Sequence, residues 1–163
     1  MNNKALKTAL LLFLVAVAIK LGEFFFFLPD ISFYVYLLLV LVAIFQGLKA
    51  SYSFNPELKF SNLFKDAMKP AALFVVLVGV FQYVYYTQID TSYYDLKIAE
   101  RLYEAEQNGY TKEEVFALQK NLKQIMNPGV AGTFELFALL MISVIYGLVT
   151  TALFLKVKLF RTI

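Results

Sequence analysis

Four long runs of hydrophobic residues, separated by shorter polar stretches, dominate the pattern of the chain. They cover residues 8–28, 31–48, 71–89 and 136–155. The last three contain no charged residue, whereas Lys20 and Glu23 interrupt the first. A helix needs about 20 mostly apolar residues to cross a hydrocarbon core of about 30 Å, so each run has roughly the length of a transmembrane helix.

The four runs predict helices rather than strands, because an open strand leaves backbone N–H and C=O groups unsatisfied in lipid. We therefore expect an all-α polytopic membrane protein that forms a single membrane domain over residues 1–163. The expected spans are about 5–28, 31–48, 70–89 and 134–156. A segment between the third and fourth spans, residues 91–129, is expected to form a helical hairpin outside the membrane.

The composition agrees with this interpretation and excludes several kinds of chemistry. Hydrophobic residues make up 60% and charged residues 17% of the 163 positions, against about 45–50% and 25% in soluble domains. The chain has neither Cys nor His, which excludes disulfides, Ser-His-Asp catalysis and histidine-containing zinc sites. The sequence thus predicts no catalytic residue, cofactor-binding residue or metal ligand, and we expect a protein that is not an enzyme.

The first run has two interpretations. Lys4 and Lys7, followed by an apolar stretch and Ala16-Val17-Ala18, resemble a signal peptide with its cleavage site. The apolar pattern resumes at 24–28, however, and extends the run to about 24 residues, which suits a membrane helix. We favour the membrane helix.

Positive charge is unevenly distributed among the loops. The N-terminus, the loop 49–70 and the C-terminus hold nine basic and two acidic residues, a net charge of +7. The other segments hold six basic and ten acidic residues, a net charge of −4, which accounts for the +3 of the whole chain. The nine basic residues are Lys4, Lys7, Lys49, Lys59, Lys65, Lys69, Lys156, Lys158 and Arg161. Because Lys and Arg are retained in cytoplasmic loops, we expect both termini and the loop 49–70 on the cytoplasmic side.

The segment 91–129 carries its own helix signals. Asn108-Gly109 is typical of a helix end, and Thr111 to Glu114 has the pattern of a capping box, which predicts helices over 92–107 and 112–126. In the second helix an apolar stripe recurs at helical spacing, formed by Val115, Leu118, Leu122 and Ile125. Asn127-Pro128-Gly129 is expected to end this helix and return the chain to the membrane.

The loop 49–70 has a different pattern. Asn55-Pro56 predicts a helix start, with Asn as the N-cap and Pro at the first helical position. Ser61 is a second possible cap, and Pro70 is expected to kink or restart the chain at the third span. On a helix the apolar residues between them would lie on one side and the lysines on the other, which favours a short helix lying on an anionic inner leaflet. A specific lipid-headgroup site is the less favoured alternative to this anchoring role.

A few polar residues lie at membrane depth. Lys20 and Glu23 are three apart, so they share a helix face and are able to pair, and Gln82 lies in the third span. Ionisable groups in a span are functional candidates, although a structural ion pair with a snorkelling Lys is the favoured interpretation. Asp30 and Glu135 are each expected at the start of a helix, where the helix dipole stabilises an acid.

Small residues recur one helical turn apart in three of the spans. They are Ala18 and Gly22, Ala43 and Gly47, and Ser143, Gly147 and Thr151. Such seams let helices approach closely, and they predict a compact bundle or a dimer.

Three segments resemble one bacterial family of membrane proteins. They are Phe64-Lys65-Asp66-Ala67-Met68-Lys69, Tyr85-Tyr86-Thr87-Gln88-Ile89-Asp90, and the Gly109-Tyr110-Thr111-Lys112-Glu113-Glu114 turn. The family is catalogued as a domain of unknown function, number 4199, and the resemblance covers nearly the whole chain. It implies a four-helix protein of the bacterial inner membrane and supplies no catalytic residue.

Three functional hypotheses follow, and the least supported is an intramembrane enzyme, because no acid–base pair can be located without His. The favoured one is a non-catalytic scaffold, accessory subunit or modulator that associates with membrane lipids and with another membrane protein or a second copy of itself, and not with nucleic acid. The alternative is a small transporter or channel subunit that uses Lys20, Glu23 and Gln82 as a pathway.

Overall fold

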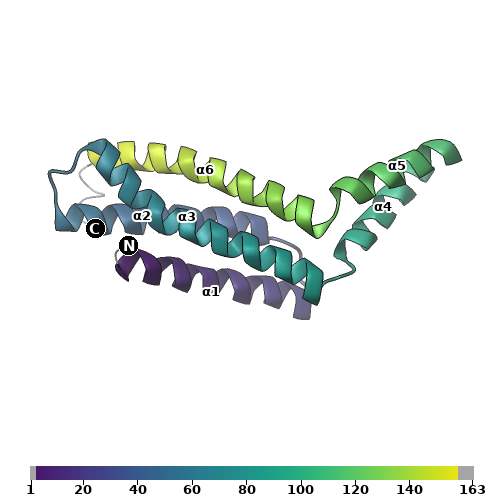
Figure 1. Ribbon diagram of the computed structural model, residues 1–163, viewed down its shortest axis with the longest axis horizontal. Coiled ribbons are helices and arrows are strands. Elements are labelled where there is room, and N and C mark those ends of the chain that lie inside the picture. The colour runs from purple at the N-terminus through teal and green to yellow at the C-terminus, as the bar shows by residue number, and fades with distance from the viewer. Residues whose placement is uncertain (1–2, 158–163) are drawn as a thin grey trace. The chain divides into compact units, whose positions relative to one another are not determined.

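The computed structural model describes residues 3–157, and this part of the chain consists of helices joined by short turns (Figure 1). The helices are α1 (Asn3–Phe25), α2 (Ser32–Phe54), α3 (Phe60–Val84), the π-helical turn η1 (Tyr85–Ile89), α4 (Tyr93–Gln107), α5 (Lys112–Ile125) and α6 (Pro128–Lys156). Two of the nine basic residues assigned to the cytoplasmic side, Lys158 and Arg161, lie outside the described residues.

Four helical segments are long and apolar enough to cross a membrane: Lys4–Phe25, Ser32–Phe54, Phe60–Ile89 and Pro128–Lys156. The prediction of an all-α protein with four such helices is confirmed. The helix bounds differ from the expected ones, because helices continue past the ends of the apolar runs. In α2, α3 and α6 the additional turns are made by polar or mixed residues, which hydropathy alone assigns to loops.

The first helix is shorter than expected. It ends at Phe25, and the chain turns at the next two residues, where Phe27 adopts a left-handed backbone conformation with φ of 52°. The apolar residues up to 28 therefore belong to the connection between α1 and α2, and hydrophobicity alone did not show this.

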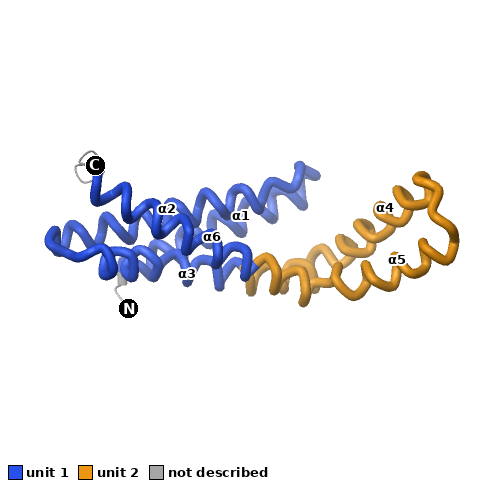
Figure 2. The backbone as a smooth tube through the Cα atoms, turned by 90° about the horizontal axis from the view of Figure 1, so that it is seen from above, with its two compact units in different colours: residues 1–78, 136–163 blue, residues 79–135 orange. Residues whose placement is uncertain are grey.

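The chain divides into two compact units, Met1–Val78 with Leu136–Ile163, and Gly79–Glu135 (Figure 2). We call them unit 1 and unit 2, and each is described by itself. The chain passes from unit 1 to unit 2 after Val78, within the last part of α3, and returns to unit 1 at Leu136, within the first part of α6.

Unit 1 is a bundle in which α1, α2 and parts of α3 and α6 enclose an apolar core. Its hydrophobic residues with no exposed surface are Ala9, Ala16, Tyr36, Val40, Ala43, Ile44, Leu48, Leu63, Ala67, Ala71, Phe74, Val75, Val78 and Leu139. The outward faces are apolar as well: Leu14 is 64% and Met141 65% exposed. Water disfavours such a surface, whereas lipid covers it without cost.

Two of the three small-residue seams lie at helix contacts. A Cβ added to Gly47 of α2 would lie 2.8 Å from Ala67 Cα, so the backbones of α2 and α3 touch there. A Cβ on Gly147 of α6 would lie 2.7 Å from Met68 Sδ. The seam predicted in α1 is different, because Ala18 is exposed and a Cβ on Gly22 would meet no atom within 4 Å.

Pro70 lies inside α3, so of the two expected effects the restart is wrong, whereas a kink of the helix stays a prediction. Proline has no N–H, so it removes the donor that would reach the carbonyl oxygen of Asp66, four residues earlier. The same oxygen faces Gly47, where an added Cβ would lie 3.0 Å from it. The glycine thus allows α2 to approach α3 where proline disturbs the helical hydrogen bonding.

The loop between α2 and α3 contains no separate helix, so the predicted start at Asn55-Pro56 is wrong. Asn55 is instead the C-cap of α2, and its side-chain oxygen accepts a hydrogen bond from the N–H of Glu57 at 3.0 Å. The next helix begins at Phe60, so Ser61 already lies within it and is not its cap. The predicted lead-in helix is simply the first part of α3.

Unit 2 contains the hairpin of α4 and α5, which pack against each other. The capping box is confirmed: the Thr111 side chain accepts from the Glu114 N–H, and the Glu114 carboxylate accepts from the Thr111 N–H at 2.8 Å. The predicted stripe of α5 is covered only in part. No residue of α5 is fully buried and Ile125 is 57% exposed, because α4 covers only one side of α5.

Candidate functional site

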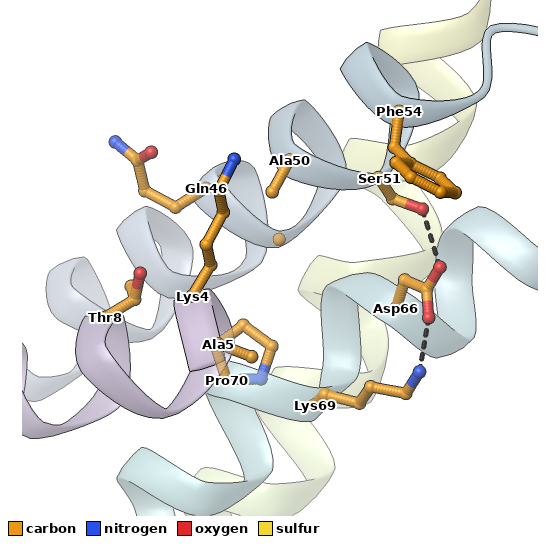
Figure 3. A pocket seen from close by; sticks show the side chains of 11 residues that line it. Lys4, Ala5, Thr8, Gln46, Ala50, Ser51, Phe54, Asp66, Lys69 and Pro70 are labelled. Carbon is orange, nitrogen blue, oxygen red and sulfur yellow. Dashed lines mark hydrogen bonds and ion pairs between the residues drawn. The ribbon is translucent and has the colours of Figure 1, made fainter. Parts of the chain in front are cut away.

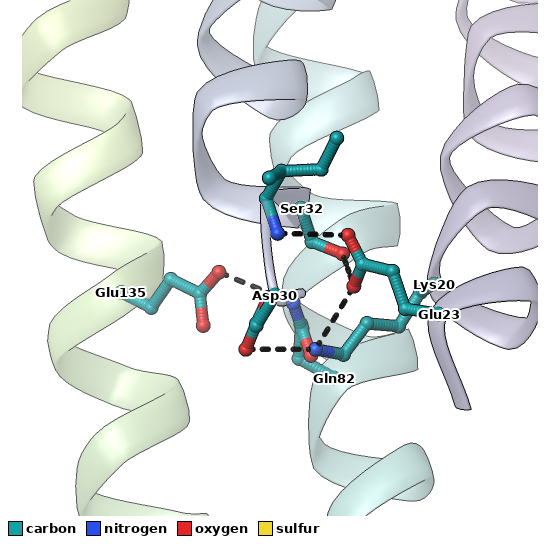
Figure 4. Close-up of polar contacts among 7 residues, drawn as sticks. Lys20, Glu23, Asp30, Ser32, Gln82 and Glu135 are labelled. Carbon is teal, nitrogen blue, oxygen red and sulfur yellow. Dashed lines mark hydrogen bonds and ion pairs between the residues drawn. The ribbon is translucent and has the colours of Figure 1, made fainter. Parts of the chain in front are cut away.

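The predicted pair Lys20 and Glu23 is present in unit 1, at the end of α1 (Figure 4). The Lys20 Nζ lies 3.5 Å from Glu23 Oε2 and 3.1 Å from Asp30 Oδ2. Lys20 is 4% and Glu23 7% exposed, whereas the side chain of Asp30 is 45% exposed. The ammonium group therefore bridges a buried and a half-exposed carboxylate.

Glu23 also holds the start of the next helix. Its Oε1 accepts a hydrogen bond from the N–H of Ile31 at 2.9 Å, and its Oε2 accepts one from the hydroxyl of buried Ser32. Both carboxylate oxygens are thus satisfied by groups from the α1–α2 connection and the first residue of α2. A buried charge with such partners is tolerated, whereas an isolated one is not.

This cluster, formed by Lys20, Glu23, Asp30 and Ser32, ties the end of α1 to the start of α2. Asp30 lies near the start of α2, as expected, directly before the N-cap Ile31, and its carboxylate pairs with Lys20. The arrangement lies at the end of a span rather than at its centre. It supports the structural interpretation of the pair.

Gln82 belongs to unit 2, and there its side-chain Nε2 donates a hydrogen bond to Glu135 Oε1 at 3.2 Å (Figure 4). Gln82 is only 2% exposed. The expectation that Glu135 lies at the start of its helix is wrong, because α6 already begins at Pro128. The helix dipole therefore does not explain Glu135, whose carboxylate accepts a hydrogen bond from Gln82.

Tyrosines surround the π-helical turn that follows α3. Tyr86 contacts Tyr85, Tyr93 and Tyr94, with ring centroids 4.7 to 5.1 Å apart. Tyr85 and Tyr86 are buried, at 2% and 7% exposed, whereas Tyr83 is 52% exposed. Only Tyr83 fits the role of an aromatic belt residue facing lipid; the buried pair packs unit 2 internally.

A second polar region of unit 1 was not singled out from the sequence. It is a cavity of about 270 Å³ where the first residues of α1, the end of α2 and the beginning of α3 meet (Figure 3). Its polar lining comes from Lys4 and Thr8 of α1, Gln46 and Ser51 of α2, and Asp66 and Lys69 of α3. We call it the three-helix cavity.

One carboxylate organises this cavity. Asp66 accepts a hydrogen bond from the Ser51 hydroxyl at 2.6 Å through one oxygen and from Lys69 Nζ at 2.5 Å through the other. The spacing of Asp66 and Lys69 on one helix allows their pairing to be predicted. The contact with Ser51 joins separate helices and carries no local signal in the sequence.

Among the described residues, no group of three or more His, Cys, Asp or Glu side chains is arranged to hold a metal ion. Comparisons of the chain with models of protein families, with curated proteins and with solved structures give no match. The resemblance to the family of unknown function therefore stays a prediction.

Proposed function

We propose that this chain is a multi-pass protein of the bacterial inner membrane that acts without catalysis, as a scaffold, accessory subunit or modulator of a larger assembly. Its partner is another membrane protein or a second copy of the chain. The observation that carries this proposal is the surface of the hairpin α4–α5.

The hairpin lies between the third and fourth span-like helices, and its helices have only 15 and 14 residues, fewer than a membrane span needs. Its tip nevertheless presents large aromatic side chains: Tyr110 is 53% and Phe116 70% exposed. Both line a depression that also includes Glu106 and Lys112. Exposed apolar groups rimmed by charges mark surfaces that contact other proteins.

The charge distribution favours a position of this hairpin outside the cytoplasm. The segments that include it carry a net −4, against +7 for the termini and the loop 49–70. The positive-inside tendency then orients both termini towards the cytoplasm. An extracytoplasmic hairpin with exposed aromatics suits a protein that docks onto its neighbour outside the bilayer.

The buried charges of unit 1 support association over transport. Lys20 and Glu23 are held by Asp30, Ile31 and Ser32 within one helix connection. These contacts join α1 to the start of α2, which is what a structural role of the pair requires.

The proposal is tested by purifying the tagged protein from its native membrane in mild detergent and measuring the proteins that co-purify in stoichiometric amounts. The double variant Tyr110→Ser, Phe116→Ser should lose its partner. The matched control is Leu96→Ser, since Leu96 of α4 is similarly exposed at 66% but does not line the depression; it should keep the partner. Purification of wild-type protein as a monomer without a stoichiometric partner would contradict the proposal.

A second copy of the chain can be distinguished from a different partner because the sequence has no cysteine. The variant Phe116→Cys has one thiol, placed at the tip of the hairpin. Under oxidation in the membrane it should give a disulfide-linked dimer if two hairpins meet, with Leu96→Cys as the control that remains monomeric. A different partner would leave Phe116→Cys unlinked to a second copy while the co-purification is kept.

The alternative function, a small transporter or channel subunit, is favoured by one contact. The bond between Gln82 and Glu135 places a carboxylate and an amide in span-like helices, and such groups often mark ion pathways. Reconstituted protein that conducts protons or cations, and loses this flux in Glu135→Gln, would place this alternative first.

A further inference from the structure

The three-helix cavity lies where membrane headgroups are expected. α2 has 23 residues, a length of about 34 Å that matches the thickness of a hydrocarbon core. The cavity is lined near one end of this helix, up to its last residue Phe54, and by Lys4 in the first turns of α1. It is therefore at the level where a spanning helix leaves the hydrocarbon, whichever side of the membrane that is.

The charges of the lining suit an anion. Two ammonium groups, Lys4 and Lys69, come from different helices, and Asp66 is the one carboxylate among the lining residues. Asp66 is already hydrogen-bonded through both oxygens, to Ser51 and Lys69. The lining thus keeps one net positive charge, which complements the single negative charge of a phosphodiester, and lysines are common phosphate ligands.

The size of the cavity suits a headgroup. Its volume of about 270 Å³ exceeds the share of one water molecule, about 30 Å³, and lies just below the range of about 300–1,000 Å³ for drug-sized ligands. The hydroxyl of Thr8 and the amide of Gln46 offer hydrogen bonds to phosphate oxygens or headgroup hydroxyls.

A neighbouring apolar groove offers a site for an acyl chain, which a phospholipid has and a free phosphate ion lacks. Apolar residues of α2 and α6 line it, including Leu41, Phe45 and Leu153. Gln46 lines both the groove and the three-helix cavity. A phospholipid with its headgroup in the cavity would pass over Gln46 and lay an acyl chain along the groove.

We propose that the three-helix cavity binds the phosphodiester headgroup of a phospholipid that carries one net negative charge, with Lys4 as the charged phosphate ligand, since Lys69 is paired with Asp66 (Figure 3). The site rests on the proposed membrane location and not on the proposed partner. Under the proposed orientation the lipid belongs to the cytoplasmic leaflet.

The test is retention of lipid by the full chain, measured by native mass spectrometry after extraction from vesicles. One set contains phosphatidylcholine alone; others add phosphatidylglycerol or phosphatidylethanolamine. The wild type should retain phosphatidylglycerol over the two zwitterionic lipids, and added inorganic phosphate should not displace it. Equal retention of all three lipids would overturn the proposal. Displacement by inorganic phosphate would also overturn it, by making the free ion the occupant.

Charge variants locate the site. Lys4→Gln should lower retention of phosphatidylglycerol about tenfold or more, as expected for a lost charge-assisted contact. Lys65→Gln removes the same charge from exposed Lys65 of α3, which does not line the cavity, and should retain lipid as the wild type does. Equal losses in both variants would show a diffuse surface effect and refute the site.

A steric variant tests the cavity without a change of charge. Ala50→Leu adds bulk at a lining position and should reduce retention while the helical circular dichroism is unchanged. Retention equal to the wild type, in the correctly folded variant, would refute the site. The hairpin variant Tyr110→Ser, Phe116→Ser should retain lipid normally, so loss of the partner and loss of the lipid are separate results.

Discussion

At the scale of single residues, Lys20 is the most informative position in the chain, because its charge is buried. It contacts two carboxylates, and one of them, Glu23, has two further donors in Ile31 and Ser32. Removing one member of a buried ion pair leaves the other charge uncompensated, which costs about 3–5 kcal/mol. Removing both members together avoids this cost.

We therefore expect Lys20→Met to destabilise the protein by about 3 kcal/mol, the lower end of that range, because Glu23 keeps its two hydrogen-bond donors. The double variant Lys20→Met, Glu23→Gln should be milder than the single one. Unfolding in detergent, followed by circular dichroism, measures both. A double variant that folds as the wild type but fails to complement a deletion phenotype would show that the charges themselves are needed, and would favour transport.

The glycines give a second prediction at this scale, as a graded series. Gly47→Ala should destabilise by about 1–3 kcal/mol, the usual cost of overpacking, since the new Cβ meets the backbone of Ala67. Gly147→Ala should cost less, because the atoms that the new Cβ meets there, Met68 Sδ at 2.7 Å and Phe64 Cε2 at 2.9 Å, belong to side chains and not to backbone. Gly22→Ala meets nothing and should be stabilising by up to about 1 kcal/mol.

The same unfolding measurements test the series, and Gly22→Ala is its internal control. Equal effects at all three positions would mean that helix propensity alone decides the outcome. The order Gly47, Gly147, Gly22 requires that α2 and α3 touch through their backbones.

At the scale of elements, two identical dipeptides show how far sequence signals extend. Asn127-Pro128 begins α6, and the Asn127 side chain accepts a hydrogen bond from the N–H of Val130 at 3.0 Å. Asn55-Pro56 begins no helix, and Asn55 caps the end of α2 instead. The dipeptide is compatible with both roles, and the packing of the surrounding residues determines which role it takes. The sequence therefore predicts a helix boundary there, but not whether a helix starts or ends at it.

The contacts of the two polar sites are likewise of two kinds, those that local spacing predicts and those that depend on tertiary packing. The pairing of Lys20 with Glu23 and of Asp66 with Lys69 follows from a spacing of three along one helix. The contact of Lys20 with Asp30 depends on the turn at Phe27, and that of Ser51 with Asp66 depends on packing between helices. Such contacts are set by tertiary structure and have no local signature.

The N-terminus of α5 gives a prediction about pH. Hydrogen bonds from the backbone N–H and then from the hydroxyl of Thr111 hold the pKa of Glu114 below its ordinary value of 4.5. The charged carboxylate is therefore favoured in the folded hairpin. The stability that it contributes is complete above about pH 4.5 and is lost as the pH falls through the lower pKa of the folded state.

We expect the protection of the α5 amides, from hydrogen exchange corrected for intrinsic rates, to decline on acidification below pH 4.5. Glu114→Gln is the matched control, because Gln also completes a capping box but does not titrate; its protection should not follow this decline. Thr111→Ala should lower stability by about 1 kcal/mol, as a lost N-cap does. A decline that is equal in Glu114→Gln would assign the effect to other groups.

At the scale of the whole molecule, the exposure of apolar residues indicates the surrounding medium, whereas the distribution of charge predicts the orientation in the membrane. The core of unit 1 is apolar, and its outward faces are apolar too, so the usual contrast between inside and outside is missing. That absence indicates a lipid surrounding but not an orientation within it. The predicted orientation rests instead on the nine basic residues of the N-terminus, the loop 49–70 and the C-terminus.

The final prediction is this orientation, and the chain suits its test because it has no cysteine. Lys65 and Glu113 are both exposed, so a cysteine at either position is within reach of a membrane-impermeant maleimide. If the loop 49–70 is cytoplasmic, intact cells should label Glu113→Cys, and Lys65→Cys only after the membrane is opened. Lys158→Cys, beyond the described residues, should behave as Lys65→Cys does. Labelling of Lys65→Cys but not of Glu113→Cys in intact cells would invert the topology. It would place the hairpin in the cytoplasm and the lipid site in the outer leaflet, but would leave the four spans unchanged.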